Sequence, residues 1–137
     1  AYYRMPERRR MPDTEFNVLG LTELPRVDIS MTYAGADGTI INALVAGGAE
    51  GIVVGAMAPG YTTPAEFEAL CTAAENGVAI VQSTRAGSGR VGDVPSRRAP
   101  GAALADNLPP QKARVLLMLA LTKTNDPVEL QRIFDEY

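Results

Sequence analysis

The sequence predicts an α/β domain of three layers, in which helices cover both faces of a small parallel sheet. Three short apolar segments, each bounded by glycine or other turn residues, are separated by stretches whose apolar residues recur with a helical period. Two further helical stretches follow the last apolar segment. Strands that alternate with helices in this way form parallel sheets with right-handed connections. At 137 residues, the chain is long enough for one such domain with a buried core.

The predicted strands are residues 27–33 (VDISMTY), 51–57 (GIVVGAM) and 78–84 (VAIVQST). The second is short, apolar and bounded by glycine, as is typical of a strand buried on both faces, and the third is predicted to be buried as well. Residues 14–21 (TEFNVLGL) are a candidate for a short edge strand. Most of residues 1–26 is polar and interrupted by proline, which predicts an interdomain linker or strap. Residues 85–108, rich in Gly, Pro, Ser and Arg, are predicted to be irregular, and the folded domain is predicted to span residues 27–137.

Four helices are predicted, over residues 38–49, 63–77, 110–121 and 126–137. Asp37 is expected to cap the first helix. Thr63 and Glu66 form a capping box at the start of the second, with proline in its first turn. Asp126 and Glu129 repeat this arrangement at the start of the last helix. These signals fix where the helices begin.

The helical period also predicts which side chains face the sheet. These are Ile40, Ile41, Leu44 and Val45 in the first helix, Phe67, Leu70 and Cys71 in the second, and Val115, Leu116, Leu119 and Ala120 in the third. A parallel sheet of three to four strands flanked by four helices has a flavodoxin-like architecture. In such folds, ligands bind outside the carboxyl ends of the strands, here at residues 33–38, 58–63 and 85–91.

The composition excludes several classes of chemistry. The chain has no histidine, which excludes Ser-His-Asp and Cys-His catalysis, and its one cysteine, Cys71, allows no internal disulfide. A formal net charge of −3 argues against a nucleic-acid binder, and no apolar run approaches the roughly 20 residues that span a bilayer. A basic cluster near the start of the chain comprises Arg4, Arg8, Arg9 and Arg10. It is consistent with a solvated strap or with a basic arm that binds RNA or a membrane, and its interruption by proline favours the strap.

Residues 83–91 (STRAGSGRV) follow the third strand and invite comparison with catalytic loops. They lack the spacing and the lysine of a phosphate-binding P-loop. Ser88 has glycine directly on both sides and no histidine to activate it, so it does not form a nucleophile elbow. Anion binding by backbone amides with Arg85 or Arg90 stays open. A turn anchored by Arg85 is the favoured interpretation.

Two other loop features have an ordinary structural explanation. In residues 35–39 (GADGT) there is one acid where a calcium loop needs several, so Asp37 is predicted to be a helix cap. Tyr61 and Thr63 lie in the loop after the second strand. Loop solvation and helix capping explain them as well as ligand contact does.

Long runs of the chain resemble one family in order and spacing. The runs are residues 24–54, 78–91 and 105–137, with 13–18 (DTEFNV) similar to the family's interdomain region. The pattern NLxPQKARVLLxLALT, present here as NLPPQKARVLLMLALT, is particularly specific because packing does not require that combination. On these motifs the sequence resembles the C-terminal domain of bacterial type II L-asparaginases.

The resemblance implies a two-domain amidohydrolase that cleaves L-asparagine, often also L-glutamine, to the acid and ammonia without a metal or organic cofactor. The threonine nucleophile of the family belongs to an N-terminal domain, whose Gly-Gly-Thr-Ile-type start and Thr-Asp-Thr run are absent here. No catalytic residue and no metal ligand is therefore assigned to this chain, which by itself is expected to be inactive. The resemblance also implies a homotetramer built as a dimer of dimers, joined to the N-terminal domain.

The family's C-terminal domain contributes to substrate binding across a subunit interface. In the family, one contributor is a polar residue in a GxGN or GxGS turn. That position is occupied here by Tyr61, which follows Gly60 and precedes Thr63. Its bulkier side chain is expected to restrict the binding of L-glutamine or to weaken activity. A second contributor, an acid, should lie between Gly92 and Gly101, where Asp93 is the candidate. Export to the periplasm or the medium is implied, with a cytoplasmic location left open, and neither nucleic acid nor a membrane is an expected partner.

Two alternatives belong to different functional classes. The chain could instead be a stand-alone, non-catalytic module for ligand binding or dimerisation. A related amidotransferase subunit that serves tRNA-linked substrates ranks last, because the sequence offers no basic nucleic-acid surface.

Overall fold

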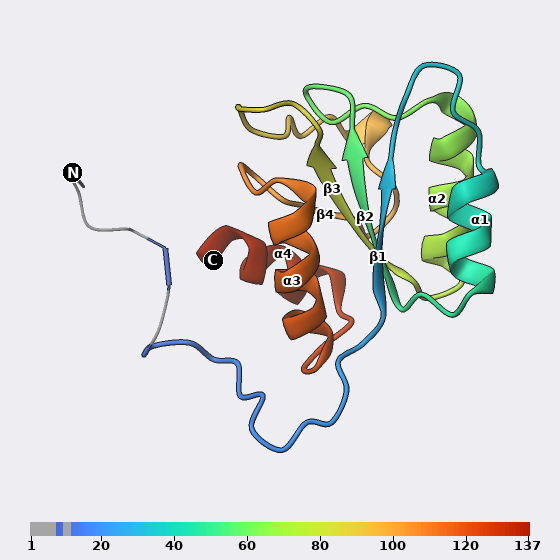
Figure 1. Ribbon diagram of the computed structural model, residues 1–137. Helices are drawn as coiled ribbons and strands as arrows, with labels where there is room; N and C mark the ends of the chain where they lie inside the picture. Colours follow the sequence, from blue (N-terminus) through green and yellow to red (C-terminus); the bar gives the residue numbers. More distant parts are fainter. Residues whose placement is uncertain (1–7, 10–11) are drawn as a thin grey trace.

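The computed structural model describes residues 8–9 and 12–137, and it confirms the predicted fold class (Figure 1). Its elements are β1 (Val27–Met31), α1 (Thr39–Ala46), β2 (Gly51–Ala56), α2 (Pro64–Glu75), β3 (Ala79–Thr84), the 3-10 turn η1 (Pro95–Arg97), β4 (Ala103–Leu104), α3 (Pro110–Leu121) and α4 (Pro127–Glu136). The three predicted strands and the four predicted helices are all present, and their ends differ from the predicted ones by a few residues at most. Two members of the basic cluster, Arg4 and Arg10, lie outside the described residues.

The strands form one parallel sheet in the order β1-β2-β3-β4. Val53, in the middle of β2, pairs with Ile29 of β1 and Val81 of β3. Every residue of β2 and β3 is buried. The apolar run of β2 therefore has the cause that was predicted, since helices cover the sheet on both faces.

The fourth strand is not the segment that the sequence suggested. Residues 14–21 form turns and irregular backbone, so the prediction of an edge strand there was wrong. The fourth strand is β4, inside the stretch 85–108 that was predicted to be irregular, where Ala103 pairs with Val81 and Leu104 with Gln82. A strand of two residues is too short to carry an alternating pattern, so its position depends on contacts with β3.

Alternate residues of the strands supply two separate cores, one on each face of the sheet. Figure 1 shows α1 and α2 on one side of the sheet and α3 and α4 on the other. Ile52 and Val54 of β2 pack with the α1–α2 layer, and Val53 packs with the α3–α4 layer. The largest fully buried side chains include Ile41, Leu70 and Ile80 in the first core and Leu117, Ile133 and Phe134 in the second.

Helix capping follows the sequence closely at α2 and less closely elsewhere. Thr63 Oγ1 accepts a hydrogen bond from the Glu66 amide at 3.2 Å, and the Glu66 carboxylate accepts one from the Thr63 amide at 3.2 Å, which completes the capping box. Asp126 caps α4 as predicted, whereas the Glu129 carboxylate binds Arg132. The cap of α1 is Gly38; the carboxylate of Asp37, predicted to be the cap, lies one residue earlier and accepts the Thr39 amide at 2.9 Å.

The helix faces are rotated slightly from their predicted positions. Val115 is 53% exposed, so its predicted burial was wrong; Ala113, Leu116, Leu117 and Ala120 line the inner face of α3. Ile40 is exposed as well, and in α2 Phe67 and Cys71 are only half-buried. The side of a helix that faces the sheet is set by the centre of its apolar stripe. Small residues such as alanine shift that centre, because they let the helix approach the sheet closely.

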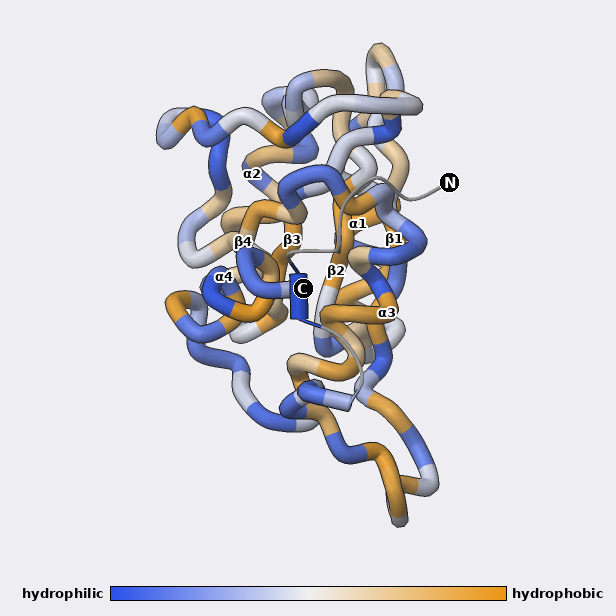
Figure 2. Tube along the Cα trace, turned by 90° about the vertical axis from the view of Figure 1, so that its left-hand side faces the viewer, coloured by the Kyte–Doolittle hydropathy of each residue, from blue (hydrophilic) through white to orange (hydrophobic). Residues whose placement is uncertain are grey.

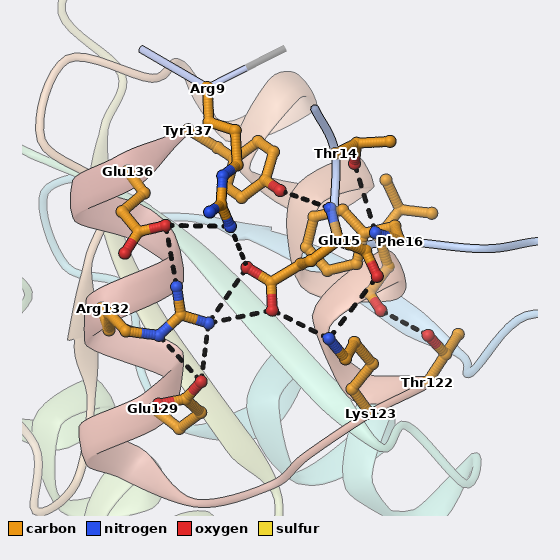
Figure 3. Close-up of polar contacts among 11 residues, drawn as sticks. Arg9, Thr14, Glu15, Phe16, Thr122, Lys123, Glu129, Arg132, Glu136 and Tyr137 are labelled. Atoms are coloured by element: carbon orange, nitrogen blue, oxygen red, sulfur yellow. Dashed lines mark hydrogen bonds and ion pairs between the residues drawn. The ribbon is translucent and has the colours of Figure 1, made fainter. Parts of the chain in front are cut away.

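A cluster of charges attaches the N-terminal segment to the last two helices (Figure 3). The carboxylate of Glu15 accepts hydrogen bonds from Arg132 of α4 at 2.9 and 3.0 Å, from Lys123 at 2.8 Å and from Arg9 at 3.1 Å. Glu15 is mostly buried under these three cations. The hydrogen bonds from Lys123 and Arg132 hold the pKa of Glu15 below its ordinary value, because they favour the ionised carboxylate.

Aromatic and backbone contacts support the same attachment. The rings of Phe16 and Tyr137 lie 5.0 Å apart, and the Tyr137 hydroxyl accepts a hydrogen bond from the Glu15 amide at 2.8 Å. Arg8 donates to the carbonyl of Phe134 at 3.0 Å. These contacts fix residues 8–16, as far as they are described, against α4.

We predict that Glu15→Gln destabilises the chain by about 1 kcal/mol at neutral pH, because the charge that binds three cations is removed. The pKa of Glu15 is lower in the folded than in the unfolded state. Its contribution is therefore present above about pH 4.5, the ordinary pKa of Glu, and is lost as the pH falls through the lower pKa of the folded state. Urea unfolding of wild type and variant across the acidic range measures this difference.

Glu68→Gln, at an exposed position on α2, is the matched control and should leave the unfolding free energy nearly unchanged. Equal stabilities of the Glu15 variant and wild type at neutral pH, or a gap that does not narrow in acid, would contradict the prediction.

Candidate functional site

The turn after β2 is the most sharply defined feature at the carboxyl edge of the sheet. Met57 and Tyr61 exchange backbone hydrogen bonds of 2.8 and 2.6 Å, which closes a tight turn through Ala58, Pro59 and Gly60. Gly60 has a φ of +126°, and a Cβ there would lie 2.7 Å from Val91 Cγ1. Only glycine fits this position without a rearrangement, because both the backbone angle and the space exclude a side chain.

Thr63 links this turn to the loop after β1. Its hydroxyl donates to the carbonyl of Ala36 at 2.7 Å and accepts the amide of Glu66. The Thr63 side chain therefore already uses its single proton within the domain. That arrangement accounts for Thr63 structurally, and its predicted place beside a substrate stays a prediction.

A buried glutamine joins the turn to two other segments. Gln82 of β3 is 4% exposed, and its Nε2 donates to the carbonyl of Gly60 at 2.8 Å and to the carbonyl of Arg97 at 3.0 Å. The backbone carbonyl of Gln82 accepts the amide of Ala105 at 2.8 Å, just after β4. Two carbonyl acceptors require the NH₂ group at this position, which settles the orientation of the amide.

Tyr61 is held in place by an arginine from η1. The guanidinium carbon of Arg97 lies 5.8 Å from the centre of the Tyr61 ring, within the range of a cation–π contact. The ring itself is half-buried. Gln82 binds the carbonyl of Arg97 as well as that of Gly60. The same side chain therefore holds both the backbone of Arg97 and the turn that carries Tyr61.

Asp93 shares the backbone framework of the turn, but its side chain is used elsewhere. The amide of Gly92 donates to the carbonyl of Pro59 at 2.7 Å, so residues 91–93 run beside the turn. The Asp93 carboxylate lies 3.5 Å from Arg98, whose guanidinium also binds Gln131 of α4 at 3.0 Å. Asp93 thus lines a polar hollow of about 420 Å³ against α4, whereas Gly60, Tyr61 and Thr63 belong to the turn.

The loop at residues 83–91 is anchored differently from the prediction. Arg85, the expected anchor, is exposed, and the described residues place no carboxylate within ion-pair distance of it. Arg90 instead lies 3.3 Å from Asp106, whose carbonyl accepts the amide of Val91 at 2.9 Å. Ser88 is exposed and lines a hollow of about 270 Å³ between this loop and the residues just before α3.

Sequence reasoning missed the two polar residues that organise this edge. Gln82 is the first of three polar residues that end a strand predicted to be buried, and this was the available signal. Asp106 is the one described non-glycine residue with a positive φ, 51°, and it binds both Arg8 and Arg90. Strained backbone of this kind persists where surrounding contacts hold it. Across the described residues, no group of three or more His, Cys, Asp or Glu side chains is placed to hold a metal ion.

The fold and this loop edge define a class of protein, namely a parallel α/β domain that presents a preorganised turn at the carboxyl ends of its strands. Within that class, residues 26–134 match the model of the glutaminase/asparaginase C-terminal domain. The chain is 42% identical to L-asparaginase 2 of Escherichia coli over 139 residues, which cover 99% of this chain and 40% of that protein. The chain belongs to the glutaminase/asparaginase family, and the resemblance seen in its motifs is confirmed.

Other relatives extend the comparison. A probable periplasmic L-asparaginase of Haemophilus influenzae is 38% identical over 99% of this chain and 40% of its own length. A glutaminase-asparaginase of Pseudomonas fluorescens is 35% identical over 99% of this chain and 38% of its own length. The chain therefore spans about two fifths of the length of these curated relatives. None of the helices in the described part of the chain combines the length and the apolar character that crossing a membrane requires.

We predict that Gln82→Met, which keeps the volume but removes the donors, destabilises the chain by about 2 kcal/mol, because two carbonyl groups lose a buried partner. The amides of the turn at Gly60 and Tyr61 should exchange with solvent faster than in wild type. Urea unfolding and amide exchange followed by NMR measure the two effects.

Gln111→Met, at an exposed position on α3, makes the same chemical change without burial and should have little effect on either measurement. Equal effects of the two substitutions would show that Gln82 does not hold the turn.

Proposed function

We propose that this chain serves as the C-terminal domain of an L-asparaginase, which hydrolyses L-asparagine to L-aspartate and ammonia, with L-glutamine as the second candidate substrate. The observation that carries the proposal is a match to L-asparaginase 2 of Escherichia coli that extends over 99% of the chain. In this proposal residues 1–26 are the strap to the preceding domain and residues 27–137 are the C-terminal domain. The enzyme is periplasmic or secreted, like the relative that is named periplasmic.

The proposal divides the chemistry between two parts of a longer protein. Acyl transfer through a threonine needs an activated hydroxyl, a base and donors for the developing oxyanion. We place all three on the preceding domain, with no cofactor or metal ion. The 137-residue chain alone is then inactive, and its role is to support a homotetramer and to complete the substrate pocket of a neighbouring subunit.

The turn after β2 is the part of this chain that we place beside the neighbour's substrate. Gly60 and Tyr61 are supported in this role by the hydrogen bond from Gln82 and the contact of the Tyr61 ring with Arg97. Thr63 adds rigidity through Ala36. Asp93 lies on the same backbone framework, and its exposed carboxylate is the remaining candidate for a polar contact with substrate.

A hybrid enzyme tests the proposal. The 137 residues replace the matching stretch of the Escherichia coli L-asparaginase 2, and ammonia release from L-asparagine and L-glutamine is measured. We expect no turnover from the isolated chain and clear turnover from the hybrid. Tyr61→Ala in the hybrid should raise KM for L-asparagine about tenfold, equivalent to about 1.4 kcal/mol of lost binding.

Tyr33→Ala, which removes an exposed aromatic ring from the loop after β1, is the matched control and should leave KM unchanged. A folded, assembled hybrid without turnover would contradict the proposal. Saturable binding of L-asparagine to the isolated chain in calorimetry would favour the stand-alone module instead.

A further inference from the structure

The loop at residues 17–25 exposes apolar side chains that the domain itself does not cover. Leu19 is 88% exposed, and the side chains beside it are Val18 at 47%, Leu21 at 47% and Leu24 at 39%. Figure 2 shows this loop as an apolar tip that projects from the lower end of the molecule. Four apolar side chains gathered on one projecting loop form an exposed patch, and the largest apolar patch of a protein surface is often an interaction site.

The loop has a defined shape, so the apolar side chains are presented in a fixed arrangement. The amide of Leu21 donates to the carbonyl of Val18 at 3.2 Å, and the amide of Leu19 donates to the side chain of Asn17 at 3.0 Å. Gly20, at the tip, has a φ of +88°, which supports the tight turn. A preformed turn loses little conformational entropy when it binds, which favours a docking role.

Both ends of the loop are fixed to the domain. Upstream, Glu15 and Phe16 are held against Arg132 and Tyr137. Downstream, the amide of Arg26 donates to the Glu50 carboxylate at 3.0 Å, immediately before β1. The loop therefore moves with this domain, and any partner that covers it also becomes aligned with the domain.

The size of the patch discriminates between two kinds of partner. Four side chains with these exposed fractions amount to a few hundred Å². A stable interface between two free molecules needs about 800 Å² on each side. A patch this small is sufficient when the partner is part of the same chain, because covalent linkage raises its effective concentration to the millimolar range.

We infer that the loop at residues 17–25 docks into an apolar depression on the polypeptide that precedes this domain in the same chain. The inference rests on the proposed function. The family model is that of a C-terminal domain, and the Escherichia coli relative is much longer than this chain, so the larger part of such a protein precedes the loop. Leu19 is the central contact, with Val18 and Leu21 on either side.

The hybrid with Escherichia coli L-asparaginase 2 allows a direct test. A photoreactive p-benzoylphenylalanine in place of Leu19 is irradiated in the assembled hybrid, and the product is analysed by denaturing electrophoresis and peptide mass spectrometry. We expect a crosslink within one chain, which leaves the monomer mass unchanged, between position 19 and the preceding domain. The same probe in place of Val128, which is 78% exposed on α4, is the control and should not react with the preceding domain.

The outcomes separate this inference from the proposed function. An active hybrid in which position 19 reacts with another subunit, or does not react at all, overturns the inference and leaves the proposed function intact. An inactive hybrid counts against the proposed function and, with it, against the inference.

A second variant does not depend on the photoreactive residue. Leu19→Asn with Leu21→Asn should make the hybrid at least tenfold more sensitive to proteolysis between the two domains, whereas Val128→Asn should not. Unchanged proteolysis of the double variant would overturn the inference.

Discussion

The hydrogen bonds of the buried Gln82 amide hold together the loop edge of this domain. Three segments that are far apart in the sequence meet at this side chain: the turn after β2, the η1 turn and β3 itself. Each carbonyl that Gln82 binds would otherwise need water or another donor, and an unpaired buried carbonyl costs about 1–3 kcal/mol. The loops at this edge of the sheet therefore form one unit, and the binding of a ligand at Tyr61 depends on the position of η1 as well.

The domain has two surfaces at opposite ends. Figure 1 shows the carboxyl ends of the strands at the top, with the loops that follow them, and the apolar loop at residues 17–25 at the bottom. The Glu15 cluster lies between the N-terminal segment and α4, so it ties that lower loop to the same rigid body as the sheet. Under the proposed function, the lower loop contacts the preceding domain, and the loop edge faces the substrate of a neighbouring subunit.

Much of the fold could be predicted from the sequence, because its strongest signals are local. The apolar run of β2 and the capping box of Thr63 and Glu66 depend on neighbouring residues, and each forms where it was predicted. β4 could not be predicted, because two residues carry no period. The exposure of Val115 was missed because the exact rotation of α3 depends on how closely it packs on the sheet.

The candidate site shows the same division between local and tertiary causes. Tyr61 was identified from the family's GxGN or GxGS turn after the second strand, but its partner Arg97 is 36 positions away and could not be inferred from spacing. Arg90, rather than the predicted Arg85, forms an ion pair with Asp106, and this contact depends on the pairing of β4 with β3, which places Asp106. The roles of Gln82 and Asp106 also depend on tertiary structure, since each side chain binds segments that are distant in the sequence.

The central claim is that the Gln82 side chain positions the turn that carries Tyr61. NMR measurement of scalar couplings across the hydrogen bonds, from Gln82 Nε2 to the carbonyl carbons of Gly60 and Arg97, tests it most directly. We predict detectable couplings to both carbonyls and slow exchange of the Gln82 side-chain amide protons. Absent couplings, with exchange as fast as that of the exposed Gln111 side chain, would contradict the claim.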